Sequence, residues 1–293
     1  MNVAGILFAL LAYGTWGITP IYWKALGEVP PNEVLAHRVL WTVVCTGLLL
    51  TGMRRWPEVR AALRVRRERL ALIACSVAIG LNWAIFLWAV AHDRILETSL
   101  GYYLNPLINV VLGLLILGEN LSRRQALAMA LAALGVLGLV VDHGGLPWVS
   151  LSLAGSFGLY GLAHKLTTVR PVPGLLVETG VLAPVALLFV GAATDPAGGE
   201  MAHGTASVGW LLAGAGPVTA FPLLCFASAA RRLPLSALGL LQYLAPTIAL
   251  LLAVFLYDEP FTRAHAFAFS CIWLALALYT SDRGAPEPMS DGG

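Results

Sequence analysis

The chain has 293 residues and a formal net charge of +2, and 58% of its residues are hydrophobic while only 12% are charged. Soluble domains carry about 25% charged residues, so this composition excludes an ordinary water-facing surface. The ten-residue alternating segments of an outer-membrane barrel are absent as well. Instead, uninterrupted apolar stretches approach the roughly 20 residues with which a helix crosses a bilayer. The sequence therefore predicts an all-α integral membrane protein whose surroundings are the lipid bilayer, and no nucleic-acid partner is expected.

Ten transmembrane helices are predicted from the apolar stretches and the breaks between them. Turn-forming segments such as Pro30-Pro31-Asn32 and Pro171-Val172-Pro173 mark the breaks, and Ser122 and Thr262 are candidate helix N-caps. No basic region precedes the first stretch, so we expect it to be retained and not cleaved as a signal peptide. The predicted helices lie near residues 4–26, 33–52, 70–91, 97–118, 122–141, 147–168, 174–194, 206–230, 235–257 and 263–281.

The positive charges predict how the helices are oriented. Of the 18 Lys and Arg residues, 14 fall in the connections on one side, and the segment 54–69 alone holds seven of them. The other side has Lys24, Arg94 and Arg263, with Arg38 just inside a helix. Because Lys and Arg are retained in the cytoplasm during insertion, both termini are predicted to be cytoplasmic. The segment 54–69 is interpreted as a solvated loop, and binding to anionic lipid or a partner is the alternative.

An internal repeat divides the chain. A shift of 140 residues aligns two Tyr-Leu-x-Pro segments, 103–106 with 243–246, and a shift of 141 aligns residues 14–17 with 155–158. The predicted organisation is a five-helix repeat at 1–143, a second repeat at 144–281, and a disordered tail at 282–293. Five is an odd number, so the second copy enters the membrane inverted. Inverted repeats place a solute site near the bilayer midplane and permit alternating access, which predicts transport.

Several segments resemble a known family. Tyr13-Gly14-Thr15-Trp16-Gly17-Ile18-Thr19-Pro20, the paired Tyr-Leu-x-Pro segments and the acidic ends Gly118-Glu119 and Asp258-Glu259 resemble the EamA-type transporters of the drug/metabolite transporter superfamily. Residues 29–38 and 100–106 resemble its RarD, or chloramphenicol-sensitivity, subfamily. The resemblance covers nearly the whole chain except the tail and part of the 195–205 loop.

This resemblance implies a permease of the cytoplasmic (inner) membrane. Its central cavity would be lined by the first, third, fourth, sixth, eighth and ninth predicted helices. The fifth and tenth helices would pack at the periphery or in a homodimer. The substrates of the subfamily are largely unassigned, so the resemblance identifies a subfamily better than a solute.

Polar side chains inside the predicted helices are the candidate solute site, because they are costly in lipid unless they face protein or water. Tyr102, Asn105 and Asn109 share one helix face at i, i+3 and i+7. The repeat aligns Gln242 with Tyr102, and aromatic faces on the first and sixth helices suit a planar or amphipathic solute. The alternative is helix-to-helix hydrogen bonding, worth about 0.6 kcal/mol on average. The predicted substrate-binding residues are Tyr13, Trp16, Asn82, Trp83, Tyr102, Asn105, Asn109, Tyr160, His164, Gln242 and Tyr243.

Four ionisable residues, His37, Arg38, Lys165 and Glu178, are predicted to couple or gate transport. His37, Arg38 and Glu178 lie about one turn inside their helices, so we expect them to reach the headgroups and to need no burial. Glu178 is expected to pair with Lys165, and Arg38 has Glu28 and Glu33 nearby. A structural ion pair is the favoured alternative to coupling.

Other chemistry is not indicated by the sequence. The four cysteines, at 45, 75, 225 and 271, lie in separate apolar stretches without metal-site spacing, so no metal and no disulfide is predicted. Neither a phosphate-binding Walker loop nor the His-Glu-x-x-His or Ser/His patterns of an embedded enzyme occur. We therefore expect a transporter that is not an enzyme, needs no cofactor and is not driven directly by ATP. A lipid flippase or scramblase shares this architecture and remains the main alternative, with a membrane-embedded enzyme behind it.

Overall fold

In the computed structural model, residues 2–26, 29–92, 95–142, 144, 148–193, 206–256 and 262–281 are described. The predicted tail at 282–293, the loop 195–205, the acidic pair Asp258-Glu259, and Glu28 and Arg94 lie outside these residues. Within them the fold is helical throughout. The helices are α1 (Val3–Lys24), α2 (Pro31–Gly52), α3 (Trp56–Arg64), α4 (Arg66–Ala91), α5 (Ile95–Ile116), α6 (Arg123–Asp142), α7 (Trp148–Leu166), α8 (Pro171–Ala193), α9 (Ala206–Ala230), α10 (Leu235–Gln242), α11 (Leu244–Leu256) and α12 (Arg263–Thr280).

Most of these helices have the length and hydropathy of membrane spans. Seven candidate spans occur in the described part of the chain: Val3–Lys24, Pro31–Gly52, Arg66–Phe86, Arg123–Asp142, Pro171–Gly191, Ser207–Ala230 and Leu235–Leu256. Two shorter apolar helices, Gly101–Ile116 and Arg263–Tyr279, accompany them. The chain is therefore a multi-pass membrane protein, as its composition predicts.

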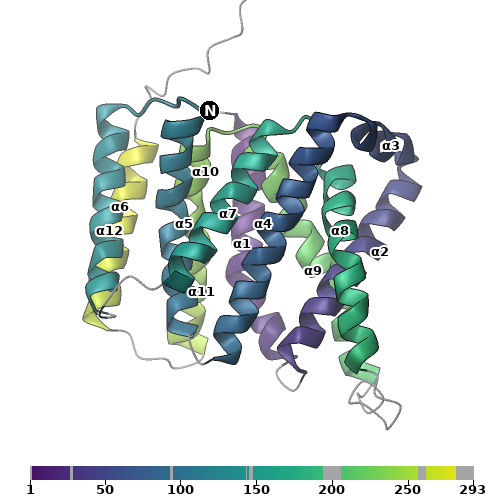
Figure 1. Ribbon diagram of the computed structural model, residues 1–293. Helices are drawn as coiled ribbons and strands as arrows, with labels where there is room; N and C mark the ends of the chain where they lie inside the picture. The colour runs from purple at the N-terminus through teal and green to yellow at the C-terminus, as the bar shows by residue number, and fades with distance from the viewer. Residues whose placement is uncertain are drawn as a thin grey trace, which may run out of the picture.

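The long helices run alongside one another in a single bundle (Figure 1). At one flank α6 packs against α12, so the fifth and tenth predicted helices are peripheral and contact each other. At the other flank α2 packs against α8 and α9. Between the flanks, α1 packs on α9 and α11, α7 packs on α4 and α5, and α10 packs on α5.

Three glycines allow neighbouring helices to approach closely. A Cβ atom on Gly216 of α9 would lie 2.5 Å from the carbonyl carbon and oxygen of Trp41 on α2. On Gly17 of α1 it would lie 2.6 Å from Ile248 of α11, and on Gly158 of α7 it would lie 2.7 Å from Ile108 of α5. Since small residues let membrane helices approach through their backbones, these contacts determine how tightly the bundle closes.

The structure differs from the prediction at the segment 54–69, which is not simply a loop. Helix α3 occupies Trp56–Arg64, begins with Pro57 in its first turn, and buries Val59 and Ala62 while its arginines stay exposed. Helix α4 then begins at Arg66, four residues before the predicted start. An amphipathic helix at the membrane surface satisfies both its apolar side and the charges that set the orientation.

A break at Tyr243 divides the ninth predicted span into α10 and α11. Pro246 explains it: proline has no N–H with which to bond the carbonyl of Gln242, and its ring clashes there. Pro106, the repeat equivalent of Pro246, lies inside a continuous α5.

Candidate functional site

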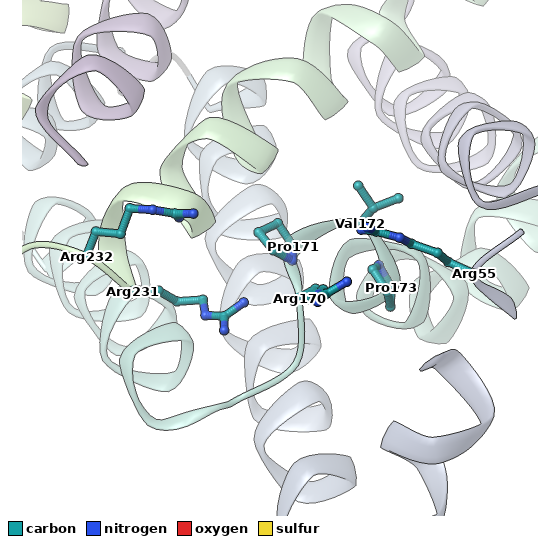
Figure 2. Close-up of a pocket in the computed structure, with 7 residues that line it drawn as sticks. All are labelled: Arg55, Arg170, Pro171, Val172, Pro173, Arg231 and Arg232. Carbon is teal, nitrogen blue, oxygen red and sulfur yellow. The ribbon is translucent and has the colours of Figure 1, made fainter. Parts of the chain in front are cut away.

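A pocket of about 530 Å³ lies at the end of the bundle where α3 is found, and four arginines line it (Figure 2). The four are Arg55, the N-cap of α3, Arg170, directly before α8, and Arg231 and Arg232, directly after α9. Partial burial, and then the neighbouring Arg232 and Arg170, lower the pKa of Arg231. Arginines predicted to share one side of the membrane therefore do gather at one end, where their field would attract anions.

Aromatic rings from α1, α7 and α9 form a continuous cluster deeper in the bundle. The ring centroids of Tyr13 and Trp16 are 5.8 Å apart, and Trp16 lies 5.6 Å from Phe157. Tyr160 stacks on Phe226 at 5.7 Å with 13° between their planes. The structure thus brings together the predicted aromatic residues of the first and sixth helices. The central Phe226 was missed, although the 140-residue repeat aligns it with Phe86.

The predicted polar face of α5 is divided between two surroundings. Asn109 Nδ2 donates to Gln242 Oε1 at 2.9 Å, and this bond joins α5 to α10. Asn105 is buried in the same interface region, with 2% exposure. Tyr102, two turns away, keeps 43% exposure, and its ring lies 6.4 Å from Phe86. Tyr243, at the break, is fully buried.

Asn82 and Trp83 are neighbours on α4 that serve different contacts. The Asn82 amide donates to Leu153 O at 2.9 Å and to Ser156 Oγ at 3.0 Å, so both of its hydrogens are used in packing α4 on α7. The Trp83 ring instead faces Arg38 of α2. The structure therefore supports helix packing as the role of Asn82.

Arg38 does not pair as expected from the sequence. Its Nε donates to Thr219 Oγ1 of α9 at 3.1 Å, and its guanidinium carbon lies 4.8 Å from the ring centroids of both Trp23 and Trp83. No ion pair forms with Glu33, because five residues along a helix turn the two side chains about 140° apart. The other expected partner, Glu28, lies outside the described residues.

Two further predictions are wrong: that Glu178 needs no burial, and that it pairs with Lys165. Glu178 is fully buried, and its Oε1 lies 3.3 Å from His164 Nε2, while Tyr160 donates its hydroxyl to Oε2 at 3.1 Å. Lys165 does not meet it, and donates instead to Leu233 O. Consecutive helical residues point about 100° apart, so α7 can turn only one of His164 and Lys165 toward α8.

The sequence spacing did not reveal a donor cluster around Glu178. Atoms of Cys75, His164 and Glu178, from α4, α7 and α8, all lie within 4.8 Å of one another and are buried. A thiol, an imidazole and a carboxylate form a donor set of the kind that holds Zn²⁺. The three residues are too far apart in sequence for their spacing to have indicated a site.

Buried polar atoms without a hydrogen-bond partner coincide with the predicted site. Unmade hydrogen bonds are costly in a protein interior, so such atoms mark places where water or a solute group is favoured. Among the described residues they are His37 Nε2, Asn105 Oδ1, Asn109 Oδ1 and the Tyr243 hydroxyl, together with His164 Nε2 and Glu178 Oε1, which form no hydrogen bond but face each other at 3.3 Å. All six residues belong to the predicted substrate or coupling sets.

Glu119 has a structural role that the candidate list did not include. Its carboxylate accepts hydrogen bonds from the backbone N–H groups of Leu235 and Ser236 and from the Ser236 hydroxyl. A carboxylate at a helix N-terminus satisfies free N–H groups and complements the helix dipole. The acidic end of the first half thus holds α10, and with it Gln242, in place.

Comparisons with known proteins agree with this architecture. Residues 3–141 match the EamA-like transporter family. The chain is 45% identical to the uncharacterized transporter YojE of Bacillus subtilis, covering 94% of this chain and 93% of that protein. It is 43% identical to protein RarD of Escherichia coli (95% and 94% covered) and 33% identical to the chloramphenicol-sensitive protein RarD of Pseudomonas aeruginosa (94% and 92%).

A solved crystal structure shares the fold, with a TM-score of 0.74 at 19% identity over 96% of this chain and 98% of that one. Identities of this size over nearly full length, together with the family match and the multi-pass helical fold, place the chain in the EamA-like transporter family of the drug/metabolite transporter superfamily, among its RarD-like members.

Proposed function

We propose that this chain is a secondary permease of the cytoplasmic membrane, which moves a small organic solute by alternating access between two inverted five-helix halves. Ten spans would arise if α10 and α11 count as one and α3 lies on the surface. The halves are residues 1–143 and 144–281.

One observation carries the proposal: the helix contacts map onto themselves when the two halves are exchanged. The contact of α4 with α7 becomes that of α9 with α1, and the contact of α2 with α9 becomes that of α8 with α4. The Gly17–Ile248 contact becomes the Gly158–Ile108 contact under the same 140- and 141-residue shifts. Such pseudo-symmetry supports an inverted repeat with an exchangeable interface, as alternating access requires.

The orientation follows from the arginine pocket. It lies at the end of the bundle where α1 begins, and the arginine-rich α3 lies at the same end (Figure 1). By the retention of positive charge in the cytoplasm, this supports a cytoplasmic N-terminus and, with an even number of spans, a cytoplasmic C-terminus.

The solute site is proposed where the halves meet, between the α1–α7–α9 aromatic cluster and the α5–α10 contact. Asn105 Oδ1 and Asn109 Oδ1 are acceptors there without a protein partner in the described residues. Aromatic surface with a few polar groups suits a small amphipathic organic molecule. One relative's name refers to chloramphenicol sensitivity, so chloramphenicol belongs among the first solutes to test.

A lipid flippase is the second candidate, because a groove of about 300 Å³ opens beside α11 and α12. Its lining is Thr247, Leu250, Leu251, Val254, Phe255, Phe269 and Trp273. An acyl chain fits such a surface. A headgroup that crosses the membrane would need a polar path. Since none of the described residues that line this groove is charged, we favour the permease.

Proteoliposomes provide the test. Vesicles with and without the protein would be loaded with chloramphenicol, amino acids, organic acids and nucleosides, and efflux would be followed by mass spectrometry, with and without a pH gradient. We expect protein-dependent efflux of at least one soluble solute. Efflux equal to that of empty vesicles for all solutes, combined with rapid scrambling of a fluorescent phospholipid, would replace the permease with a flippase.

A further inference from the structure

Arg38 is a cation that faces the interior of the bundle. It lies seven residues after the start of α2, about 10 Å along the helix axis. Its contacts come from three other helices: Trp23 of α1, Trp83 of α4 and Thr219 of α9. The Tyr102 side chain of α5 also lies within electrostatic range of the guanidinium. The guanidinium therefore points toward protein and away from the lipid.

Neighbouring side chains hold the guanidinium of Arg38 in place, but they do not neutralise its positive charge. Nε is engaged by the Thr219 hydroxyl, and the two indole rings flank the charge at 4.8 Å each. Among the described residues, no carboxylate lies within ion-pair distance of Arg38, and its terminal nitrogens have no hydrogen-bond acceptor. Cation–π contacts orient and partly stabilise the cation, but they leave its positive charge in place.

An ionised side chain at this depth is expensive unless it meets an opposite charge, and such residues mark substrate pathways. The two free terminal nitrogens point in the fixed geometry that binds a planar carboxylate through two parallel hydrogen bonds. A guanidinium flanked by two indole rings suits a carboxylate better than a phosphate, which usually gathers more donors.

We propose that Arg38 binds the carboxylate of the transported solute, so that the substrate class is small organic carboxylates. This inference rests on the permease function proposed above and names its substrates. The apolar part of the solute lies toward Tyr102, whose side chain is partly exposed, while the buried Trp83 ring packs against the guanidinium. Trp23, Trp83 and Thr219 are positioning residues, because their contacts fix the orientation of the guanidinium toward the carboxylate.

The test is equilibrium binding to the full chain in nanodiscs of phosphatidylcholine alone. The probes are three carboxylates and their neutral amides: acetate and acetamide, benzoate and benzamide, and indole-3-acetate and its amide, with inorganic phosphate added. Binding is read as a saturable rise in melting temperature, together with a change in tryptophan fluorescence from Trp23 and Trp83. We expect at least one carboxylate to bind, its amide to bind far more weakly, and phosphate not to compete.

Arg38→Gln should weaken carboxylate binding by about 10- to 100-fold, since a charge-assisted pair is lost. Arg38→Lys keeps the charge but loses the planar geometry that makes two parallel hydrogen bonds, so it should recover only part of the affinity. This second variant keeps the test valid if the glutamine variant fails to fold. Arg60→Gln is the matched control, because Arg60 is exposed on α3 and its substitution removes the same charge. We expect this variant to bind carboxylates with the affinity of the wild type.

Three results would overturn the inference: amides that bind as tightly as their acids, undiminished carboxylate affinity in both Arg38 variants, or no binding by any carboxylate. A fourth, stabilisation that depends on Arg38 but arises only when phosphatidylglycerol is added, would assign the arginine to a lipid headgroup. Transport separates the two proposals. Efflux restricted to neutral solutes and insensitive to Arg38→Gln keeps the permease and removes the carboxylate, whereas the absence of any efflux removes the permease.

Discussion

The Asn109–Gln242 hydrogen bond joins α5 to α10, and a double-mutant cycle measures how much it contributes to the free energy of unfolding. The substitutions are Asn109→Leu and Gln242→Met, which keep side-chain volume while removing the polar groups. Both residues are buried, and the bond is 2.9 Å long. Each single variant leaves one partner without its bond, and the double variant removes both groups.

The structure also predicts which single substitution lowers the free energy of unfolding more. Asn109 Oδ1 already has no partner in the described residues, so Gln242→Met leaves both ends of the Asn109 amide unsatisfied. Leaving a buried polar group unpaired costs about 1–3 kcal/mol. Asn109→Leu instead removes an unpaired acceptor, so its cost should be the smaller by about 1 kcal/mol. Measured side-chain bonds in membrane proteins average about 0.6 kcal/mol and reach about 1.7, so we expect a coupling energy near 1 kcal/mol.

The assay is unfolding by titration with sodium dodecyl sulfate, followed by tryptophan fluorescence, for the wild type and the three variants. Additive free energies, within about 0.3 kcal/mol, would refute the reasoning, as would a larger cost for Asn109→Leu. Uptake normalised to folded protein completes the experiment. We expect uptake to fall in Asn105→Ala and in Asn109→Leu, because each removes an acceptor oxygen without a protein partner in the described residues, and to change less in Gln242→Met, whose amide oxygen accepts from Asn109.

Two further predictions concern packing and orientation. Gly216→Ala should lower the melting temperature by several degrees because its Cβ would lie 2.5 Å from the Trp41 backbone, whereas Gly209→Ala on the same helix meets nothing within 4 Å and should be neutral or stabilising. Thermal unfolding of both variants in one detergent checks this, and equal melting temperatures would contradict it. A phosphatase fused after residue 293 should be inactive and a fluorescent protein fused there should be active, since both termini are proposed to be cytoplasmic. An active phosphatase would reverse the orientation.

Apolar runs were enough to find the membrane helices, because crossing a bilayer leaves a long and continuous signal in the sequence. The same logic missed α3, since a short surface helix needs only two buried residues, Val59 and Ala62, and charged residues surround them. Periodicity also placed Asn105 and Asn109 on a common buried face. Which residues meet across helices was less predictable, because a rotation of one residue, from Lys165 to His164, changes the partner of Glu178.

The repeat explains why the two ends of the bundle can differ in chemistry. A shift of 141 residues aligns His37 with Glu178, Trp23 with His164 and Arg38 with Thr179. An exact duplicate would present the same groups at both ends. Here Arg38 lies between two indoles and its counterpart is Thr179, whereas Glu178, the counterpart of His37, is bonded to a tyrosine and lies beside an imidazole. The packing glycines, Gly17 and Gly158, are meanwhile unchanged. In the proposed alternating-access mechanism, conversion between inward- and outward-facing states requires only that the interface be symmetric, so the side chains at each end can differ.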